Sequence, residues 1–365
     1  MRIAFYVNWN EGPAGTMYTG VFKKIEDQVS CWQAYQHSVR VFLLTGEQCA
    51  LARPDEAGFS FPVTVETYHS RLDRFRRSSS IVHDMIDWEP DVIYFRQSTF
   101  TPVEGYLVRH HPVIVEINVD DFIEFRLAPA YVYWYHRLTR GCLLRHVAGM
   151  VFVTGELSQK RYFACYRKPF AVIGNGIDLS RYPCLPPKSN SRPRLVFISA
   201  GGQAYHGVDK ITRLARRFPS WHFDLIGLTS DDVQGDVPSN VVPHGSLSRD
   251  SYEPIMRQAD VGLGPLALHR KQMNEACPLK VRDYLALGIP AIIGSRDTDF
   301  PEQVPFLLEL PNTPDNVEGH TAAIAQFVES WRGKRVPREA VAHLDVRVKE
   351  KLRLAFFQKV IGRGA

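Results

Sequence analysis

A predicted helix with an apolar run on each side lies between Pro265 and Ile293, and this segment constrains the fold more than any other. Pro278 suits the first helical turn because its missing N–H is not needed there. Gly288 follows the last apolar residues, where helices commonly end, and Pro290 leads into the apolar run AIIG. An apolar run, a polar loop, a helix and a second apolar run together predict a βαβ unit of a parallel sheet.

Two acids stand on either side of the start of this predicted helix. Glu275 precedes it and Asp283 lies on its second turn, with seven residues between them. The backbone amides of Cys277, Leu279 and Lys280 lie at the positive end of the helix and favour an anionic group such as phosphate. Since carboxylates accept hydrogen bonds from hydroxyls, two sugars joined by phosphate fit, which describes a nucleotide-sugar. An ordinary amphipathic helix with two solvated acids is the alternative interpretation.

This pattern resembles the Glu-x7-Glu signature of retaining glycosyltransferases of the GT-B fold, specifically glycosyltransferase family four. The resemblance implies that Glu275 holds the transferred sugar and that Asp283, one methylene shorter than the usual Glu, holds the nucleotide ribose. It also implies an α/β fold with two Rossmann-like, doubly wound domains facing across a cleft. The resemblance covers most of the chain and is most specific from Gly201 to Asp299.

The length of 365 residues and the order of the predicted elements agree with two domains. Apolar runs alternate with helical patterns on both sides of the segment RYPCLPPKSNSRPR, which has four prolines and few apolar residues. We predict an acceptor-side domain over 1–180, a linker over 181–193, a nucleotide-sugar-binding domain over 194–344 and a C-terminal helix over 345–365. The resemblance implies that this last helix packs back on the first domain.

Further donor contacts are implied by the resemblance. Gly20 matches the glycine whose backbone approaches the diphosphate, and His244–Gly245 matches the region that lines the base. Many family members carry an Arg and a Lys after the first strand of the second domain, whereas this chain has His206 in the Lys position. Lys280 is therefore predicted to stabilise the leaving group, with Lys210 as a second candidate. The predicted donor-binding residues are Gly20, Gly201, Gly202, His206, Gly227, His244, Gly245, Glu275, Ala276, Cys277, Pro278, Leu279, Lys280 and Asp283.

Polar residues follow the apolar run PVIVEI in the first half of the chain. Open α/β sheets place ligands at the carboxyl ends of their strands. Asn118 and Asp120 are therefore predicted catalytic residues beside Glu275 and Lys280, and Asp121 is a candidate for sugar contacts. Many family members carry a histidine where Asn118 aligns, and this chain lacks that proton carrier. For the acids, loop or capping roles are the alternative.

The segment 130–149 is rich in aromatic residues and arginines, which allows two interpretations. It is either a helix that touches a membrane or a lipid-linked acceptor, or a core helix with solvated arginines. We expect the second, because aromatic side chains are mostly buried and arginines mostly exposed.

Composition limits the partners. A net charge of +5 suits an anionic substrate or an acidic membrane surface and is too small to indicate nucleic acid. The six scattered cysteines have no metal-type spacing and indicate reduced thiols in the cytoplasm, with peripheral contact at the inner face of the membrane left open. No apolar run approaches the length of a membrane span. We expect no metal and no other cofactor, because neither Asp120–Asp121 nor Asp231–Asp232 is suitably placed and the family needs none.

The predicted activity is transfer of a sugar, with retention, from a nucleoside-diphosphate sugar to a hydroxyl of a glycan, lipid-linked or other acceptor. A dinucleotide enzyme is disfavoured because the first predicted strand lacks the GxGxxG spacing after it. A sugar-nucleotide epimerase or phosphorylase-like enzyme on the same fold stays open. So does a catalytically degenerate partner subunit that binds nucleotide-sugar without transfer.

Overall fold

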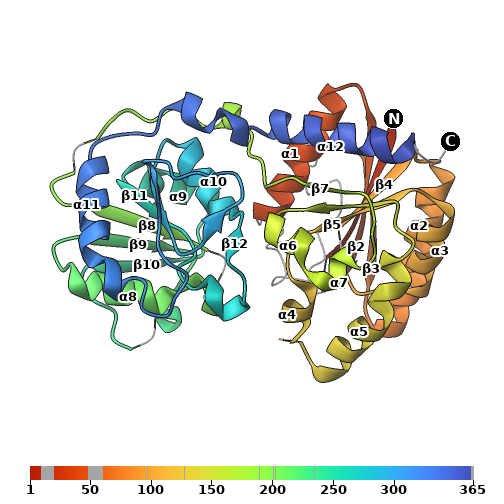
Figure 1. The fold of residues 1–365 in the computed structure, drawn as a ribbon, viewed down its shortest axis with the longest axis horizontal. Coiled ribbons are helices and arrows are strands. Elements are labelled where there is room, and N and C mark those ends of the chain that lie inside the picture. The colour runs from red at the N-terminus through yellow and green to blue at the C-terminus, as the bar shows by residue number, and fades with distance from the viewer. Residues whose placement is uncertain are drawn as a thin grey trace. The chain divides into compact units, whose positions relative to one another are not determined.

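The computed structural model describes residues 1–9, 20–47, 61–96, 98–126, 128–188, 190–199, 201, 203–233 and 235–362. The chain forms two compact units, one comprising Met1–Gly174 with Val346–Ala365 and the other Asn175–Asp345. Each unit is a parallel sheet flanked by helices (Figure 1). The predicted α/β fold with two doubly wound, Rossmann-like domains is confirmed at this level.

The first unit is built on seven parallel strands in the order β3-β2-β1-β4-β5-β6-β7. This is the doubly wound order, in which the direction of winding reverses beside β1. The strands are β1 (Arg2–Trp9), β2 (Ser38–Gly46), β3 (Val63–Tyr68), β4 (Val92–Arg96), β5 (Val113–Ile117), β6 (Gly149–Phe152) and β7 (Phe170–Val172). The helices are α1 (Gly20–Ala34), α2 (Arg71–Asp87), α3 (Pro102–His110), α4 (Asp121–Arg126), α5 (Ala130–Leu144), α6 (Gly155–Gln159), α7 (Arg161–Ala164) and α12 (Val346–Ile361).

The second unit repeats this winding with six parallel strands in the order β10-β9-β8-β11-β13-β15. They are β8 (Arg194–Ile198), β9 (His222–Ile226), β10 (Val241–Gly245), β11 (Val261–Leu263), β13 (Ala291–Ile293) and β15 (Leu307–Glu309). Its helices are α8 (Val208–Arg217), α9 (Arg249–Arg257), α10 (Leu279–Ala286) and α11 (Thr321–Trp331). Two short strands, β12 (Glu275–Ala276) and β14 (Arg296–Asp297), pair separately.

The predicted βαβ unit is present as β11, α10 and β13. Helix α10 begins after Pro278, and Gly288 has the left-handed φ of +74° that favours glycine just beyond a helix end. Tyr284 fixes the helix on the sheet, because its Oη donates to Leu263 O over 3.1 Å. A Cβ on Gly262 would lie 2.3 Å from the Tyr284 ring, so the close approach of helix and strand requires glycine there.

Helix α12 belongs to the core of the first unit. Phe357 packs against Trp32 of α1 and Tyr94 of β4. Arg353 is buried and donates to Tyr94 Oη and to Glu350 Oε2, each over 2.8 Å, and the indole of Trp32 donates to the same Glu350 oxygen. Because these buried polar groups bind one another, the last helix is held by hydrogen bonds as well as by apolar contact.

The chain passes from the first unit to the second between Gly174 and Asn175 and returns after Asp345. Residues 181–193, which we predicted to be a linker, contribute Tyr182 and Leu185 to the apolar core of the second unit.

The aromatic segment is not the core helix that we expected. In α5, Trp134 and Tyr131 are 56% and 50% exposed, whereas Arg140 is buried. Arg140 is tolerated there because its guanidinium binds both oxygens of Asp121 and lies 4.5 Å from the centre of the Phe122 ring. In the described part of the chain, no helix combines the length and apolar character that crossing a bilayer requires.

Candidate functional site

A buried ion network lies beneath the start of α10. The side chain of Arg282 is completely buried and donates to the two oxygens of Asp297 over 2.6 and 2.7 Å and to Asp299 Oδ2 over 2.8 Å. Its Nη2 also lies 2.8 Å from Cys277 Sγ, and its Nε donates to Asn175 O over 3.1 Å. These partners satisfy a guanidinium that would otherwise be very costly to bury.

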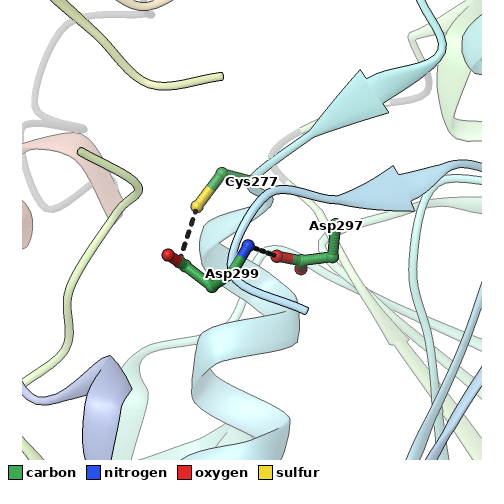
Figure 2. Close-up of side chains that lie close together, drawn as sticks. All are labelled: Cys277, Asp297 and Asp299. Atoms are coloured by element: carbon green, nitrogen blue, oxygen red, sulfur yellow. Dashed lines mark hydrogen bonds between the residues drawn. The ribbon is translucent and has the colours of Figure 1, made fainter. Parts of the chain in front are cut away.

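Cys277, Asp297 and Asp299 offer three potential metal-ligand atoms within 4.8 Å of one another (Figure 2). Cys277 Sγ donates to Asp299 Oδ2 over 3.6 Å, and Asp299 N donates to Asp297 Oδ1 over 3.0 Å. Burial raises the pKa of the Cys277 thiol to about 12, whereas metal ligation needs the thiolate. Since the guanidinium of Arg282 already supplies a cation to both acids, the cluster fits a structural ion network rather than a metal centre.

This network fixes the strand that carries Glu275. In β12, Glu275 is paired with Arg296 and Ala276 with Asp297, so Arg282 holds the partner strand of the predicted sugar-binding acid. The backbone of the next residue, Cys277, is also held, because Asn175 Nδ2 donates to its carbonyl oxygen over 2.6 Å. Glu275 itself is half-buried, immediately before α10.

Lys280 presents a buried ammonium group at the start of α10. Within the described residues its Nζ has no hydrogen-bond partner, and it lies 4.0 Å from the centre of the Phe197 ring. Burial lowers the pKa of Lys280 to about 7. A buried, unpaired ammonium is unfavourable. An anion bound beside the α10 amides would supply the missing partner.

His206 lies beside Lys280 and is neutral. Its Nδ1 is 3.1 Å from Gly201 O and 3.0 Å from Ser199 Oγ. Burial, and then the charge of Lys280, lower the pKa of His206 to about 3. The facing carbonyl places the single proton on Nδ1, so Nε2 is an acceptor. His206 therefore does not replace the positive charge of the lysine that many family members carry.

Lys210 is engaged elsewhere, so the expectation that it helps the leaving group is wrong. Its Nζ donates to Leu266 O, Thr313 O and Asn316 Oδ1 over 2.9, 2.7 and 2.7 Å. All three donors of the ammonium are thereby used. The side chain is completely buried and ties α8 to two loops.

Gly227 follows β9 directly and meets the carboxyl end of β10, which is formed by His244 and Gly245. Gly227 N donates to Gly245 O over 2.7 Å, and the two glycines have φ values of +81° and +67°. A Cβ on Gly227 would lie 1.6 Å from Ser199 O, so no other residue fits there. His244 Nε2 lies 2.8 Å from Oδ1 of the buried Asp224, which orients the imidazole.

Asp283 lies one turn into α10, in a cluster of polar residues. Its Oδ1 accepts a hydrogen bond from Tyr182 Oη, and the guanidinium of Arg249 stacks 5.2 Å from the centre of the Tyr182 ring. Burial, and then the charge of Asp283, raise the pKa of Tyr252 to about 12. The contact with ribose that we predicted for Asp283 stays a prediction.

In the first unit, Asn118 joins a buried ion pair. Lys24 Nζ donates to Glu116 Oε1 over 2.8 Å and to Asn118 Oδ1 over 3.0 Å, while Asn118 Nδ2 donates to Glu116 Oε2 over 2.9 Å. Burial raises the pKa of Glu116, but the charges of Lys24, Arg353 and Arg96 outweigh it and hold that pKa well below its usual range. Both ends of the Asn118 amide are thus used within the protein.

Asp120 has the capping contact that the sequence left open as an alternative, and Asp121 forms an ion pair that the sequence did not predict. Asp120 Oδ1 accepts from Ile123 N over 3.3 Å, and its other oxygen accepts from Tyr162 Oη. Asp121 binds Arg140 with distances of 2.7 and 3.2 Å. Both acids are buried. Their contacts stabilise the start of α4, and a catalytic role for Asp120 stays a prediction.

Two predicted contacts involve segments outside the described residues. Gly20 begins α1 and is exposed, but the glycine-rich segment 10–19 before it is not described. Gly202 also lies outside the described residues, while its neighbour Gly201 has a φ of +110°, and no described atom lies within 4 Å of where a Cβ on it would stand.

The carboxyl ends of β8, β9 and β10 bring together four of the predicted donor residues, Gly201, His206, Gly227 and Gly245. Ser199 connects them, since its Oγ contacts His206 while its carbonyl packs against Gly227. This is the edge at which doubly wound sheets bind ligands. Sequence reasoning missed Arg282 and its acids, because a charged residue on an amphipathic helix carries no local sign of burial. The two acids in the segment SRDTD, Asp297 and Asp299, were the available sign of a buried cation nearby, because alternate residues of an extended segment point the same way.

Neither a protein-family model nor the sequence of a curated protein matches this chain. Solved structures match it along nearly its whole length. The apo lipopolysaccharide outer core galactosyltransferase WaaB is 11% identical, with a TM-score of 0.64 and all of both chains covered. Anabaena HepE in complex with UDP and glucose is 13% identical, with a TM-score of 0.65 over 98% of this chain and 100% of that chain.

UDP-GlcNAc 2-epimerase from Neisseria meningitidis, bound to UDP-GlcNAc, is also similar, with 14% identity and a TM-score of 0.56 over 98% of this chain and all of that chain. The chain has the GT-B fold of the glycosyltransferase structures that it matches. Because an epimerase is among its neighbours, the activity has to be argued from the site.

Proposed function

We propose that this chain, which has the GT-B fold, is a retaining glycosyltransferase of family four. It transfers a sugar from a nucleoside-diphosphate sugar to a hydroxyl of a glycan, lipid-linked or other acceptor. The observation that carries this proposal is the buried ammonium of Lys280, which has no hydrogen-bond partner among the described residues and lies at the positive end of α10. A protein keeps such a costly group where a ligand completes it.

The ligand group that fits Lys280 is a diphosphate. The first-turn amides of α10 and the ammonium give an anion both hydrogen-bond donors and positive charge. Neutral His206 adds an acceptor, Nε2, which suits a hydroxyl next to the phosphates rather than a phosphate oxygen. The same residues that would bind the diphosphate in the ground state would stabilise the charge that develops on it as the sugar leaves.

We assign each of the remaining predicted donor residues to one part of the nucleotide-sugar. Glu275, held by β12 and β14, accepts hydrogen bonds from the hydroxyls of the transferred sugar. Asp283 accepts from the ribose, and the backbone around His244 and Gly245 contacts the base. In the reaction the bond between the sugar and the diphosphate breaks, the acceptor oxygen bonds to the same sugar carbon, and the hydroxyl proton of the acceptor passes to the departing diphosphate.

We propose that no metal ion is needed, because Lys280 and the α10 amides can balance the charge of the departing diphosphate. The enzyme is proposed to work in the cytoplasm, with peripheral contact at the inner face of the membrane.

Thermal unfolding with UDP, GDP, ADP and their sugars tests the donor site, since a ligand that binds only the native state raises the midpoint. Lys280→Met is the informative variant. Lys334→Met, which changes an exposed lysine of the same unit, is the matched control. We expect one nucleotide to shift the wild type and the control but not Lys280→Met. Equal shifts in all three proteins would exclude Lys280 from the site.

Turnover then separates the remaining functions. A transferase consumes the donor only with an acceptor and releases the free nucleotide, whereas an epimerase converts the nucleotide-sugar without releasing it. Binding with neither reaction, across a panel of glycan and lipid-linked acceptors, would identify a partner subunit.

A further inference from the structure

Helix α5 has an apolar face that stays exposed in the described structure. Its inner face, with Arg140, Leu143 and Leu144, is buried in the first unit. On the outer face Tyr131, Trp134, Tyr135 and Leu138 are 50%, 56%, 36% and 77% exposed. The spacing of these four residues places them on one stripe along the helix. A stripe of this kind normally faces a core, yet here it faces outward.

Two further exposed apolar side chains lie on α2, a helix of the same unit (Figure 1). Leu72 and Phe75, on the first turns of α2, are 83% and 43% exposed. Arg71 joins the two helices, since its guanidinium lies 4.4 Å from the centre of the Tyr131 ring and donates to Tyr131 Oη. We call these six side chains the α2–α5 patch: Leu72, Phe75, Tyr131, Trp134, Tyr135 and Leu138.

The patch is unusual for this molecule. It holds half of the large apolar side chains that are exposed in the described part of the chain. Scattered exposed apolar residues need no explanation, but a gathering of this size on two adjoining helices marks an interaction surface.

Positive charges border the patch. Arg71 and Arg76 are exposed on α2, and the guanidinium of Arg137 lies 5.8 Å from the centre of the Trp134 ring. Helix α5 contains no Asp or Glu, and Asp73 of α2 is in an ion pair with Arg77. The partner therefore has to be apolar within and negatively charged at its surface.

We propose that the α2–α5 patch docks on an anionic lipid surface. Trp and Tyr favour the boundary between lipid tails and headgroups, and exposed arginines bind anionic headgroups. Trp134 and Leu138 enter the interface, while Arg71, Arg76 and Arg137 contact lipid phosphates. A second copy of this chain is a poorer occupant, because two identical patches would bring like charges together. This inference rests on the proposed function, which includes contact with a membrane. It identifies the α2–α5 patch as the surface that makes this contact.

Sedimentation with vesicles tests the patch without any sugar transfer. The vesicles contain phosphatidylcholine alone or phosphatidylcholine with phosphatidylglycerol. The test variant carries Trp134→Glu and Leu138→Glu. The control variant carries Val348→Glu and Leu352→Glu, which change two exposed apolar residues of α12 in the same unit. Thermal unfolding of each variant establishes that it is folded, because all four positions are at least 43% exposed.

We expect the wild type and the control to bind anionic vesicles, and the test variant to bind at least about tenfold more weakly. Arg71→Ala with Arg137→Ala should also weaken binding, and added salt should reduce it further. Equal binding to neutral vesicles, or an equal loss in test and control, would overturn the proposal. The proposal would also be overturned if the wild type were a dimer and the test variant a monomer. Vesicle binding without donor binding would leave this inference standing while the proposed function fails.

Discussion

Lys280 and His206 pack against the same aromatic ring, that of Phe197, and the positive charge of the first helps to keep the second neutral. Burial lowers the pKa of both side chains, to about 7 for Lys280 and about 3 for His206. Lys280 is therefore a cation of this site whose charge is poised near neutral pH. This arrangement leads to the first prediction.

Lys280→Met should weaken nucleotide binding and yet stabilise the free protein. In the unfolded chain Lys280 keeps its proton up to its ordinary pKa of about 10.4. The native state releases that proton near 7, so between these values the unfolded state binds more protons and native stability rises with pH. Methionine removes the cost of charging the buried group. Urea unfolding at about pH 6, where Lys280 is charged, compares the wild type with Lys280→Met. The free energy of unfolding should be higher for the variant.

A bound diphosphate should raise the pKa of Lys280, so nucleotide binding takes up a proton near neutral pH. Affinity then falls by up to about tenfold per pH unit above 7. Calorimetric titration in buffers of different ionisation enthalpy counts that proton. Its absence in the wild type would show that Lys280 is not beside the phosphates.

Glu275→Ala and Asp283→Ala should separate the two ends of the donor. Glu275 is predicted to bind only the transferred sugar. Its loss should therefore weaken binding of the nucleotide-sugar and leave the affinity for the free nucleotide unchanged. Asp283 is predicted to bind the ribose, which both ligands contain. Its loss should therefore weaken the binding free energy of both ligands by about 1–3 kcal/mol, the value of a hydrogen bond to a charged group. Titration of each variant with both ligands checks this. Identical effects of the two substitutions on the free nucleotide would contradict the assignment.

Arg282→Met should destabilise the second unit strongly. It removes the cation between Asp297 and Asp299 and leaves two carboxylates near each other with no counter-ion, which costs about 3–5 kcal/mol for a buried pair. Urea unfolding measures the loss. Arg249→Met is the control, because Arg249 is an exposed arginine of the same unit and its pair with Glu253 is worth about 1 kcal/mol or less. Similar losses in the two variants would show that the buried network is not a main source of stability.

Glu104→Gln should make the stability of the first unit less dependent on pH. Burial raises the pKa of Glu104 to about 7, although Thr101 N donates to its carboxylate over 2.7 Å. Because the folded pKa is raised, the folded state binds more protons than the unfolded state between about pH 4.5 and 7. Stability from this group is present below that window and falls by about 3 kcal/mol across it as pH rises.

Urea unfolding at about pH 5 and pH 8 compares the wild type with Glu104→Gln. The wild type should lose more stability between these two values than the variant, since glutamine keeps the acceptor oxygen without a titrating proton. The same loss in both proteins would place the pKa of Glu104 near its ordinary value.

The α10 region was predictable because its signals are local. Pro278 and Gly288 set the two ends of the helix by backbone conformation alone, and the apolar runs on each side set the βαβ unit. The spacing of Glu275, in β12, and Asp283, in α10, is likewise set within one short stretch of the chain. Such features depend on residues a few positions apart, so the sequence contains them in full.

Burial and partners were decided by the tertiary structure. Lys210 and Lys280 are both lysines near the start of a helix, yet one binds three oxygens from distant loops and the other binds none in the described part of the chain. The aromatics of α5 face outward while Arg140 lies inside, which is the reverse of what composition predicts. These outcomes depend on which segments meet in the folded chain. A local sequence pattern predicts a helix and its apolar face, but it does not determine which segments that face will contact.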